Sequence, residues 1–314
     1  MPNASHPINQ IMIPQDLGQI RFDRWLSAQF PDYSRSEIQQ WIKNGLVLSN
    51  GKKIRPGSHA VPGMKLDIQI PLIVQDQAPQ AEDLPLEILY EDADLIAINK
   101  RTGQVVHPAP GHLEGTVLNA MLHHFPDMAD AGETHRPGLV HRLDVGTSGV
   151  MLFARNSEAL ENLQNAFKAR QVSKMYHCIC HGIPDPYQQT CTQAIGRHPV
   201  HRKKRAVDGL SPRDAITHFK LLKGVAGGNG GLLEVKIETG RTHQIRVHLS
   251  HVGHPVIGDT VYAGKQAQFS APWPKAERVM LHAKQIEFPH PKTGALLKIE
   301  AEYSSDMESY LSLL

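Results

Sequence analysis

The chain has 314 residues, of which 40% are hydrophobic, and a formal net charge of +2 at pH 7. This length suits one large core plus a small satellite domain, because domains commonly contain about 100 to 200 residues, and the low net charge leaves nucleic-acid binding to local basic patches. Three cysteines, no four-ligand Cys/His zinc pattern and no apolar run of membrane-spanning length argue against disulfide-stabilised, zinc-dependent and membrane proteins, so we expect a cytoplasmic protein.

The segment 16–70 has the pattern of two helices followed by short strands. Apolar residues recur at helical spacing in two stretches, and the second is headed by Ser34 with Glu37 completing a capping box. The pattern then changes to strands joined by an Asn50-Gly51 turn. Polar, proline-punctuated sequence follows and indicates a linker. The expected division is an N-terminal tail (1–15), this small domain (16–70), a linker (71–83) and a large domain (84–314).

The small domain resembles an S4 RNA-binding domain in its order of helices and hairpin-linked strands. In that family the helix pair presents basic residues to structured RNA. A solvated charged face is the alternative interpretation of any single one of these residues, and their clustering favours RNA. The matching residues here are Arg21, Arg24, Arg35, Lys43, Lys52, Lys53 and Arg55.

From Leu84 onward, short strand-like runs alternate irregularly with helical stretches such as Ser157 to Ala169. A parallel sheet of βαβ units would give a regular alternation instead. The pattern therefore predicts an α+β domain with a largely antiparallel, mixed sheet.

One carboxylate in this domain is a candidate nucleophile. Asp144 follows Arg142 by two residues and precedes a turn of Thr147, Ser148 and Gly149. An aspartate that caps this turn through its own backbone would give the same local sequence. Two motifs further along the chain favour a catalytic role of Asp144 over a role as a turn cap.

The first of these motifs, Ser173 to Tyr176, is expected to open a strand and to present a phenol to the same cleft. The second follows an expected strand over Gly231 to Ile237, where Thr242 can cap a helix and Arg241 lies at the junction. A guanidinium at this point can pair with a partly buried carboxylate and keep it ionised. We therefore expect Arg241 to pair with Asp144.

Together these motifs resemble the pseudouridine synthases of the RluA/RluD family, whose motifs correspond to His141–Gly149, Lys174–Tyr176 and Thr239–His248. Two positions depart from the family pattern: Arg101 stands where the family usually has proline, and Val145-Gly146 where it has a charged pair. The second departure makes the rim of the site less charged and could alter which substrate is chosen. The resemblance extends to Ile98-Asn99-Lys100, Gly103, His107-Pro108, Arg197-His198-Pro199, Gly253-His254-Pro255, Gly258-Asp259, Tyr262 and Leu281-His282-Ala283.

The resemblance implies an active cleft across the middle of the sheet and an isomerase that converts uridine in structured RNA to pseudouridine without cofactor or metal. The reaction breaks the bond from C1′ to N1 and rejoins the base through C5, so one ionised carboxylate, Asp144, suffices to attack the sugar or the base. Tyr176 is expected to pack on the uracil rather than remove a proton, because a phenol is a poor base at neutral pH; a core tyrosine is the alternative.

The expected substrate contacts surround Asp144. Ile245 would supply an apolar wall, and Arg142 would fill the space that the flipped base leaves, as its family counterpart implies, with a surface ion pair as the alternative. His141, Arg246 and His248 are further candidates, although packing would explain the last two equally well. Outside the cleft, a basic loop made of Arg202, Lys203, Lys204 and Arg205 is expected to grip phosphates.

Three rival interpretations remain. A zinc site would use His248, His251 and His254, which helical spacing brings together without an acidic or cysteine ligand. A glycoside hydrolase would need a second acid. An RNA-binding ribosome-assembly factor without catalytic activity would not need Asp144, Tyr176 and Arg241.

The substrate is assigned by resemblance only. Phe30 to Ser36 and the Arg197-His198-Pro199 element are similar to the branch that modifies large-subunit (23S) ribosomal RNA, so ribosomal RNA, free or in pre-ribosomal particles, is the expected partner. Transfer RNA is the alternative. We expect a monomer that binds neither a membrane nor a metal.

Overall fold

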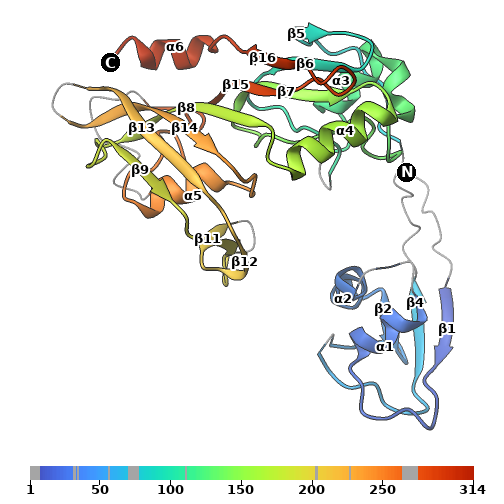
Figure 1. The fold of residues 1–314 in the computed structure, drawn as a ribbon. Coiled ribbons are helices and arrows are strands. Elements are labelled where there is room, and N and C mark those ends of the chain that lie inside the picture. Colours follow the sequence, from blue (N-terminus) through green and yellow to red (C-terminus); the bar gives the residue numbers. More distant parts are fainter. Residues whose placement is uncertain are drawn as a thin grey trace. The chain divides into compact units, whose positions relative to one another are not determined.

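The computed structural model divides the chain into two compact units, Met1–Gln77 and Ala78–Leu314 (Figure 1). The described residues are 8–30, 33, 35–55, 57–69, 78–109, 112–201, 204–225, 228–263 and 275–314. None of the helices in these ranges is both long and apolar enough to cross a membrane.

The N-terminal unit packs two helices against a four-stranded sheet with the order β1-β4-β2-β3. Its core contains Phe22, Trp25 and Leu26 from the first helix and Ile38, Trp41 and Ile42 from the second, so the helical spacing of these apolar residues places each set on one buried face. The elements are β1 (Ile8–Met12), α1 (Phe22–Gln29), α2 (Arg35–Asn44), β2 (Val47–Ser49), β3 (Lys52–Lys53) and β4 (Lys65–Gln69).

The start of the chain differs from the sequence prediction. Strand β1 lies in the range 1–15, which we expected to be a tail, and it pairs antiparallel with β4, Ile8 opposite Gln69. Its sequence, INQIM, has weak alternation, so the strand depends on a partner more than fifty residues away that no local pattern reveals. The predicted capping residue Ser34 and the linker residues 71–77 lie outside the described residues.

A buried carboxylate joins the two helices of this unit. The Asp23 side chain is 0% exposed and accepts hydrogen bonds from Arg21, Arg35 and Gln39. Burial alone would raise the pKa of Asp23, but these hydrogen bonds outweigh it and lower the pKa to about 2. Arg21 and Arg35, two of the predicted RNA contacts, thus have an internal partner, while their side chains stay 47% and 51% exposed.

The C-terminal unit is built on a nine-stranded sheet, β5-β6-β7-β15-β8-β14-β13-β9, with β16 paired to β15. All its pairs are antiparallel except β7 with β15. The strands are β5 (Ile88–Glu91), β6 (Leu95–Lys100), β7 (Ser148–Ala154), β8 (Ser173–His181), β9 (Gln188–Cys191), β13 (Thr217–Gly224), β14 (Gly230–Ile237), β15 (Leu281–Pro289) and β16 (Leu296–Glu300).

Helices cover both faces of this sheet. Ile96 and Ile98 of β6 face a large core that also holds apolar side chains of α3, α5 and α6, whereas Leu95 and Ala97 face a second core with α4 (Figure 1). This alternation is the period of two that a strand buried on both faces requires. The predicted α+β class with a mixed, mostly antiparallel sheet is therefore confirmed. The helices are α3 (Val117–His124), η1 (Pro126–Asp130), α4 (Ser157–Lys168), α5 (Gln244–His251) and α6 (Ser305–Leu311).

Gly149 allows the parallel pairing of β7 with β15. Its φ is +111°, and a Cβ at this position would lie 2.2 Å from the carbonyl oxygen of Ala283 in β15. Only glycine fits this close approach. The turn that carries Asp144 therefore leads directly into the centre of the sheet.

A small three-stranded sheet, β11-β10-β12, projects beside α5 (Figure 1). It comprises β10 (Ile195–Arg197), β11 (Arg205–Val207) and β12 (Leu210–Arg213). The predicted basic loop lies between β10 and β11, where Arg202 and Lys203 are outside the described residues. Lys204 donates to the carbonyl oxygen of Val261 at 2.7 Å, so one hydrogen bond of its ammonium is already used inside the protein.

We predict that Asp23→Asn destabilises the N-terminal unit by about 1 to 3 kcal/mol at pH 7, because it removes the charge that two arginines and a glutamine stabilise. Since the pKa of Asp23 is depressed from 3.8 to about 2, this stabilisation is complete above about pH 5 and is lost as the pH falls through 3.8 toward 2. The difference between variant and parent should therefore shrink in acid.

Urea unfolding of the full chain in a Trp273→Phe background measures this effect, since Trp25 and Trp41 then report on the N-terminal unit alone. Asp16→Asn, at an exposed carboxylate of the same unit, is the matched control. Equal midpoints for the two variants at pH 7 would contradict the role given to Asp23.

Candidate active site

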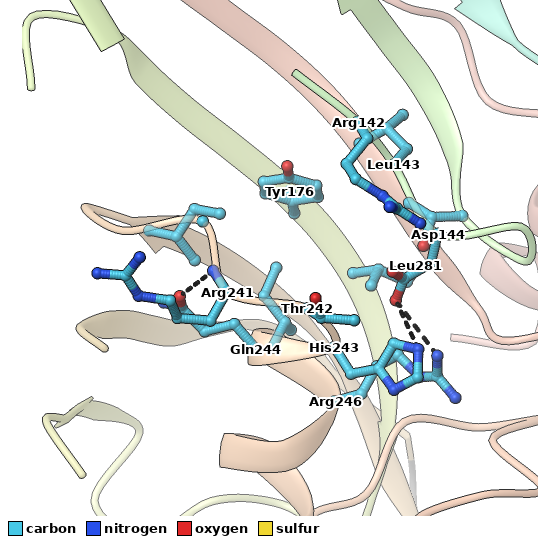
Figure 2. Close-up of a pocket in the computed structure, with 14 residues that line it drawn as sticks. Arg142, Leu143, Asp144, Tyr176, Arg241, Thr242, His243, Gln244, Arg246 and Leu281 are labelled. Atoms are coloured by element: carbon cyan, nitrogen blue, oxygen red, sulfur yellow. Dashed lines mark hydrogen bonds and ion pairs between the residues drawn. The ribbon is translucent and has the colours of Figure 1, made fainter. Parts of the chain in front are cut away.

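A cavity of about 90 Å³ opens at the middle of the large sheet. Its wall is formed by the turn before β7, by β8, by the start of β15 and by the segment that leads into α5, so parts of the chain far apart in sequence meet there (Figure 2). The lining residues are Arg142, Leu143, Asp144, Thr147, Tyr176, Ile237, Gly240, Arg241, Thr242, His243, Gln244, Ile245, Arg246 and Leu281.

The turn that carries Asp144 is held through its main chain. Lys100, which is 1% exposed, donates from Nζ to the carbonyl oxygens of Arg101 and Thr147 at 2.9 Å and of Val145 at 3.4 Å. Burial lowers the pKa of Lys100 to about 8, although the nearby Asp144 charge acts in the opposite direction. A buried ammonium with three carbonyl partners fixes the shape of the turn and hence the position of the carboxylate.

Asp144 is paired with Arg246. Arg246 Nη1 lies 3.2 Å from Asp144 Oδ2 (Figure 2). Nε and Nη2 of the same guanidinium donate to Asp259 at 2.7 and 3.0 Å. The Asp259 side chain is fully buried, and its Oδ1 also accepts from the main-chain nitrogens of Val261 and Tyr262. Arg246 is therefore fixed by a bidentate pair and offers its remaining edge to Asp144.

The predicted pairing of Arg241 with Asp144 is wrong in this structure. Arg241 lines the cavity, but its Nε donates to the carbonyl oxygen of Asp214 at 3.0 Å and its guanidinium points away from Asp144 (Figure 2). Arg241 lies in the segment that leads into α5, whereas Arg246, five residues later, lies in the first turn of this helix. Arg246 is the arginine whose side chain reaches the carboxylate.

The predicted helix cap at Thr242 is also corrected. Helix α5 begins at Gln244, and His243 precedes it in a left-handed conformation with φ of 60°. The Gln244 side chain closes the junction by accepting from the main-chain nitrogen of Arg241 and from the Thr239 hydroxyl. This bend turns the first residues of α5 toward the cavity.

His243 lies beside Asp144, with Nε2 3.9 Å from Asp144 Oδ2. Its Nδ1 is 2.7 Å from the Tyr262 hydroxyl, which accepts from the main-chain nitrogen of Arg205. The Tyr262 hydroxyl therefore donates its hydrogen to His243 Nδ1. The ring hydrogen of His243 is then on Nε2 and points toward Asp144. Burial lowers the pKa of His243, so the ring is neutral at pH 7. This chain of contacts ties strand β11 to the carboxylate.

Tyr176 and Ile245 form an apolar wall opposite these charges. Both are buried, at 8% and 5% exposure, and Leu281 lines the same cavity. Burial, together with the negative charge of Asp144, raises the pKa of Tyr176 well above its ordinary value of 10.0. The phenol therefore stays protonated at neutral pH.

The two residues before Leu143 lie differently from each other. Arg142 is exposed and lines the cavity next to Asp144, as expected (Figure 2). His141, predicted to bind substrate, does not line it: its ring stacks on Phe167 and its Nε2 accepts from the main-chain nitrogen of Leu152 at 2.9 Å. Burial lowers the pKa of His141 to about 3. In free protein this histidine is a packing residue.

Within the part of the chain that the structure describes, His248, His251 and His254 do not bring three ligand atoms close enough together to hold a metal ion. His248 is buried, and its two ring nitrogens contact the Thr217 hydroxyl and the carbonyl oxygen of Gln193, each at 2.9 Å. Elsewhere in the described residues, Asp92, Asp94 and His290 lie together. Both ring nitrogens of His290 have hydrogen-bond partners: Nε2 contacts Asp92, and Nδ1 accepts from main-chain N–H groups. These internal hydrogen bonds explain why the three side chains lie together.

Sequence reasoning missed the supporting residues Lys100, Asp259, Tyr262 and His243. All lie in segments that carried the family resemblance, but nothing in their local sequence assigned them a partner. A lysine at the end of an apolar strand, as Lys100 is, was the one available signal of a buried charge.

We predict different stabilities for two arginine variants of this segment. Arg246→Met should destabilise the protein by about 3 to 5 kcal/mol, because it leaves the buried carboxylate of Asp259 without its positively charged partner. Arg241→Met should cost less than about 1 kcal/mol, since it removes a single hydrogen bond at a half-exposed position. Urea unfolding followed by circular dichroism compares them, and similar losses would refute the assignment of the pair.

Comparison with known proteins agrees with this geometry. Residues 94–251 match the model of the RNA pseudouridylate synthase family, and residues 20–66 match the S4 domain. An uncharacterized RNA pseudouridine synthase of Synechocystis is 39% identical over 99% of this chain and 95% of its own length. The ribosomal large subunit pseudouridine synthase D of Pseudomonas aeruginosa is 39% identical over 96% and 94% of the two chains.

A solved structure is similar as well. Human RNA pseudouridylate synthase domain containing 1 superimposes with a TM-score of 0.57 at 27% identity, over 71% of this chain and 85% of the human one. The similarity in sequence extends over nearly the full chain and includes both units. The chain therefore belongs to the RluA family of RNA pseudouridine synthases and carries an N-terminal S4 domain.

Proposed function

We propose that this pseudouridine synthase acts on uridine in large-subunit ribosomal RNA, with Asp144 as the nucleophile. The observation that carries the proposal is the Asp144 carboxylate held by the buried Arg246 in a cavity whose opposite wall is the Tyr176 ring. The choice of RNA is supported by the Pseudomonas aeruginosa relative, whose name specifies the ribosomal large subunit.

The site can perform the isomerisation with its own side chains. Asp144 attacks the sugar C1′ or the uracil base, the bond from C1′ to N1 breaks, and the base turns before C5 bonds to C1′. The bond to Asp144 then breaks, and the proton that C5 loses is balanced by the proton that N1 gains, so the reaction is an isomerisation without net loss of atoms. Arg246, at 3.2 Å, stabilises the negative charge of the carboxylate before the attack and after the base has been rejoined. His243 and Tyr262 act as positioning residues for the same oxygen.

Tyr176 and Arg142 complete the proposed roles. Because its pKa is raised, Tyr176 serves as an aromatic surface for the uracil and not as a base. Ile245 packs beside it. Arg142, exposed at the mouth of the cavity, fills the space left by the target base after it has been extruded from its stack. The partly exposed guanidinium of Arg241 binds an RNA phosphate near the rim.

RNA binding at a distance from the cavity is assigned to basic side chains of both units. In the N-terminal unit the exposed edges of Arg21 and Arg35 remain available beside Asp23. Further candidates are Arg24, Lys43, Lys52, Lys53 and Arg55, with Lys204 and Arg205 in the C-terminal unit.

Pseudouridine mapping tests the proposal. Ribosomal and transfer RNA are labelled with carbodiimide after isolation from cells that lack this protein and are complemented with wild type, Asp144→Asn or Asp130→Asn. Sites in large-subunit RNA should be restored by wild type and by the Asp130 variant, whose exposed carboxylate lies outside the cavity, and not by Asp144→Asn. Restored sites confined to transfer RNA would replace the proposed substrate, and rescue by Asp144→Asn would remove the nucleophile assignment.

We predict that Tyr176→Phe is more active than Tyr176→Leu. Phenylalanine keeps the ring that stacks on the base, and aromatic stacking contributes about 1 to 3 kcal/mol per base, or roughly a 5- to 150-fold difference in rate. Release of tritium from RNA labelled at C5 of uridine measures turnover. Equal activity of the two variants would contradict the stacking role of the Tyr176 ring.

A further inference from the structure

A second cavity lies beside the proposed active site. It has a volume of about 620 Å³, within the range of about 300 to 1,000 Å³ typical of pockets for small molecules. Arg142 lines both cavities, so this exposed side chain separates them. The other lining residues used below are His107, Arg136, Leu139, Leu160 and Gln164.

His107 is the unusual member of this wall. It is 8% exposed, and its Nδ1 is the one fully buried side-chain nitrogen or oxygen among the described residues without a hydrogen-bond partner. Leaving such an atom unpaired costs about 1 to 3 kcal/mol. Burial, and then the charges of Arg136 and Arg142, lower the pKa of His107 to about 4. At neutral pH the ring therefore offers one donor and one acceptor.

The rest of the wall complements a nucleotide. Leu139 and Leu160 supply apolar surface for the face of a base, and Gln164 adds an amide. Arg136 and Arg142 are both exposed and provide two guanidinium groups for phosphate. The wall also contains one acidic residue, Glu133, whose carboxylate lies 3.1 Å from His135 Nε2.

We propose that this second cavity binds another nucleotide of the substrate RNA while the target uridine occupies the Asp144 cavity. The inference rests on the proposed function, because it takes the RNA to be the substrate. Extruding one base disrupts the stacking of its neighbours and costs a few kcal/mol. A pocket on the other side of Arg142 that accepts a displaced neighbour, or the former pairing partner, recovers part of this cost.

Site-directed crosslinking tests the occupancy. The native cysteines Cys178, Cys180 and Cys191 are buried, so a cysteine introduced on the surface can be labelled selectively with a thiol-reactive azide. Gln164→Cys places the label in the wall of the cavity, and Glu161→Cys, exposed on the same helix α4 but not part of that wall, is the matched control. The RNA is deproteinised 23S ribosomal RNA from cells that lack the enzyme.

After irradiation, stops in reverse transcription identify the crosslinked nucleotides. The Gln164→Cys protein should give crosslinks within a few nucleotides of the modified uridine, or at its pairing partner, at least fivefold more often than the Glu161→Cys protein. Equal crosslinking by the two proteins would overturn the proposal.

Two substitutions of His107 test the chemistry. His107→Phe removes the ring nitrogens and should raise KM about tenfold, the equivalent of one hydrogen bond, while kcat and the melting temperature do not fall. His107→Asn retains a nitrogen close to the position of Nδ1 and should recover most of the lost affinity. A lower melting temperature with unchanged KM for His107→Phe would mean a purely structural histidine.

The same preparations separate this inference from the proposed function. If the wild-type protein forms pseudouridine in the 23S RNA but Gln164→Cys gives no excess of crosslinks, only the second nucleotide site is refuted. If the wild-type protein leaves this RNA unmodified, the ribosomal substrate is refuted and the second site for it falls as well.

Discussion

The arrangement of the active site depends on one buried guanidinium. Arg246 is held in a bidentate pair by Asp259, which is itself fully buried and fixed by main-chain N–H groups. A buried charge of either sign is costly without its partner, so this pair must form as the domain folds. Asp144 therefore pairs with an Arg246 guanidinium whose position is already fixed by Asp259. The packing of α5 against the sheet thus positions the proposed nucleophile, and the Tyr262 ring packs against the same guanidinium, 5.1 Å from its central carbon.

Local sequence patterns were sufficient for elements whose periodicity is strong. The strand that begins at Ser173, the strand ending at Ile237 and the helix from Ser157 appear where alternation and helical spacing placed them. The family motifs likewise brought Asp144, Tyr176 and Ile245 to one cavity. These features depend on neighbours in sequence or on residue types that stand out by themselves.

The sequence predictions were wrong where the structure depends on a backbone angle or on a contact between residues far apart in sequence. Arg241 and Arg246 are equally plausible partners for Asp144 until the left-handed residue His243 sets the direction in which α5 starts. His141 is three residues from Asp144, but it turns toward α4 and Phe167. Asp259 acquires its role only through Arg246, and strand β1 exists only through β4. None of these contacts can be recognised from the local sequence pattern.

The turn around Asp144 tolerates different side chains at the rim of the cavity. The carbonyl oxygens of Val145, Gly146 and Thr147 accept hydrogen bonds from Lys100, Thr102 and Arg278, so the turn is held by main-chain atoms that every residue type possesses. The Val145 side chain points into solvent and is 47% exposed. The side chain at position 145 can therefore change in charge and size while the main-chain hydrogen bonds keep the Asp144 carboxylate in its place.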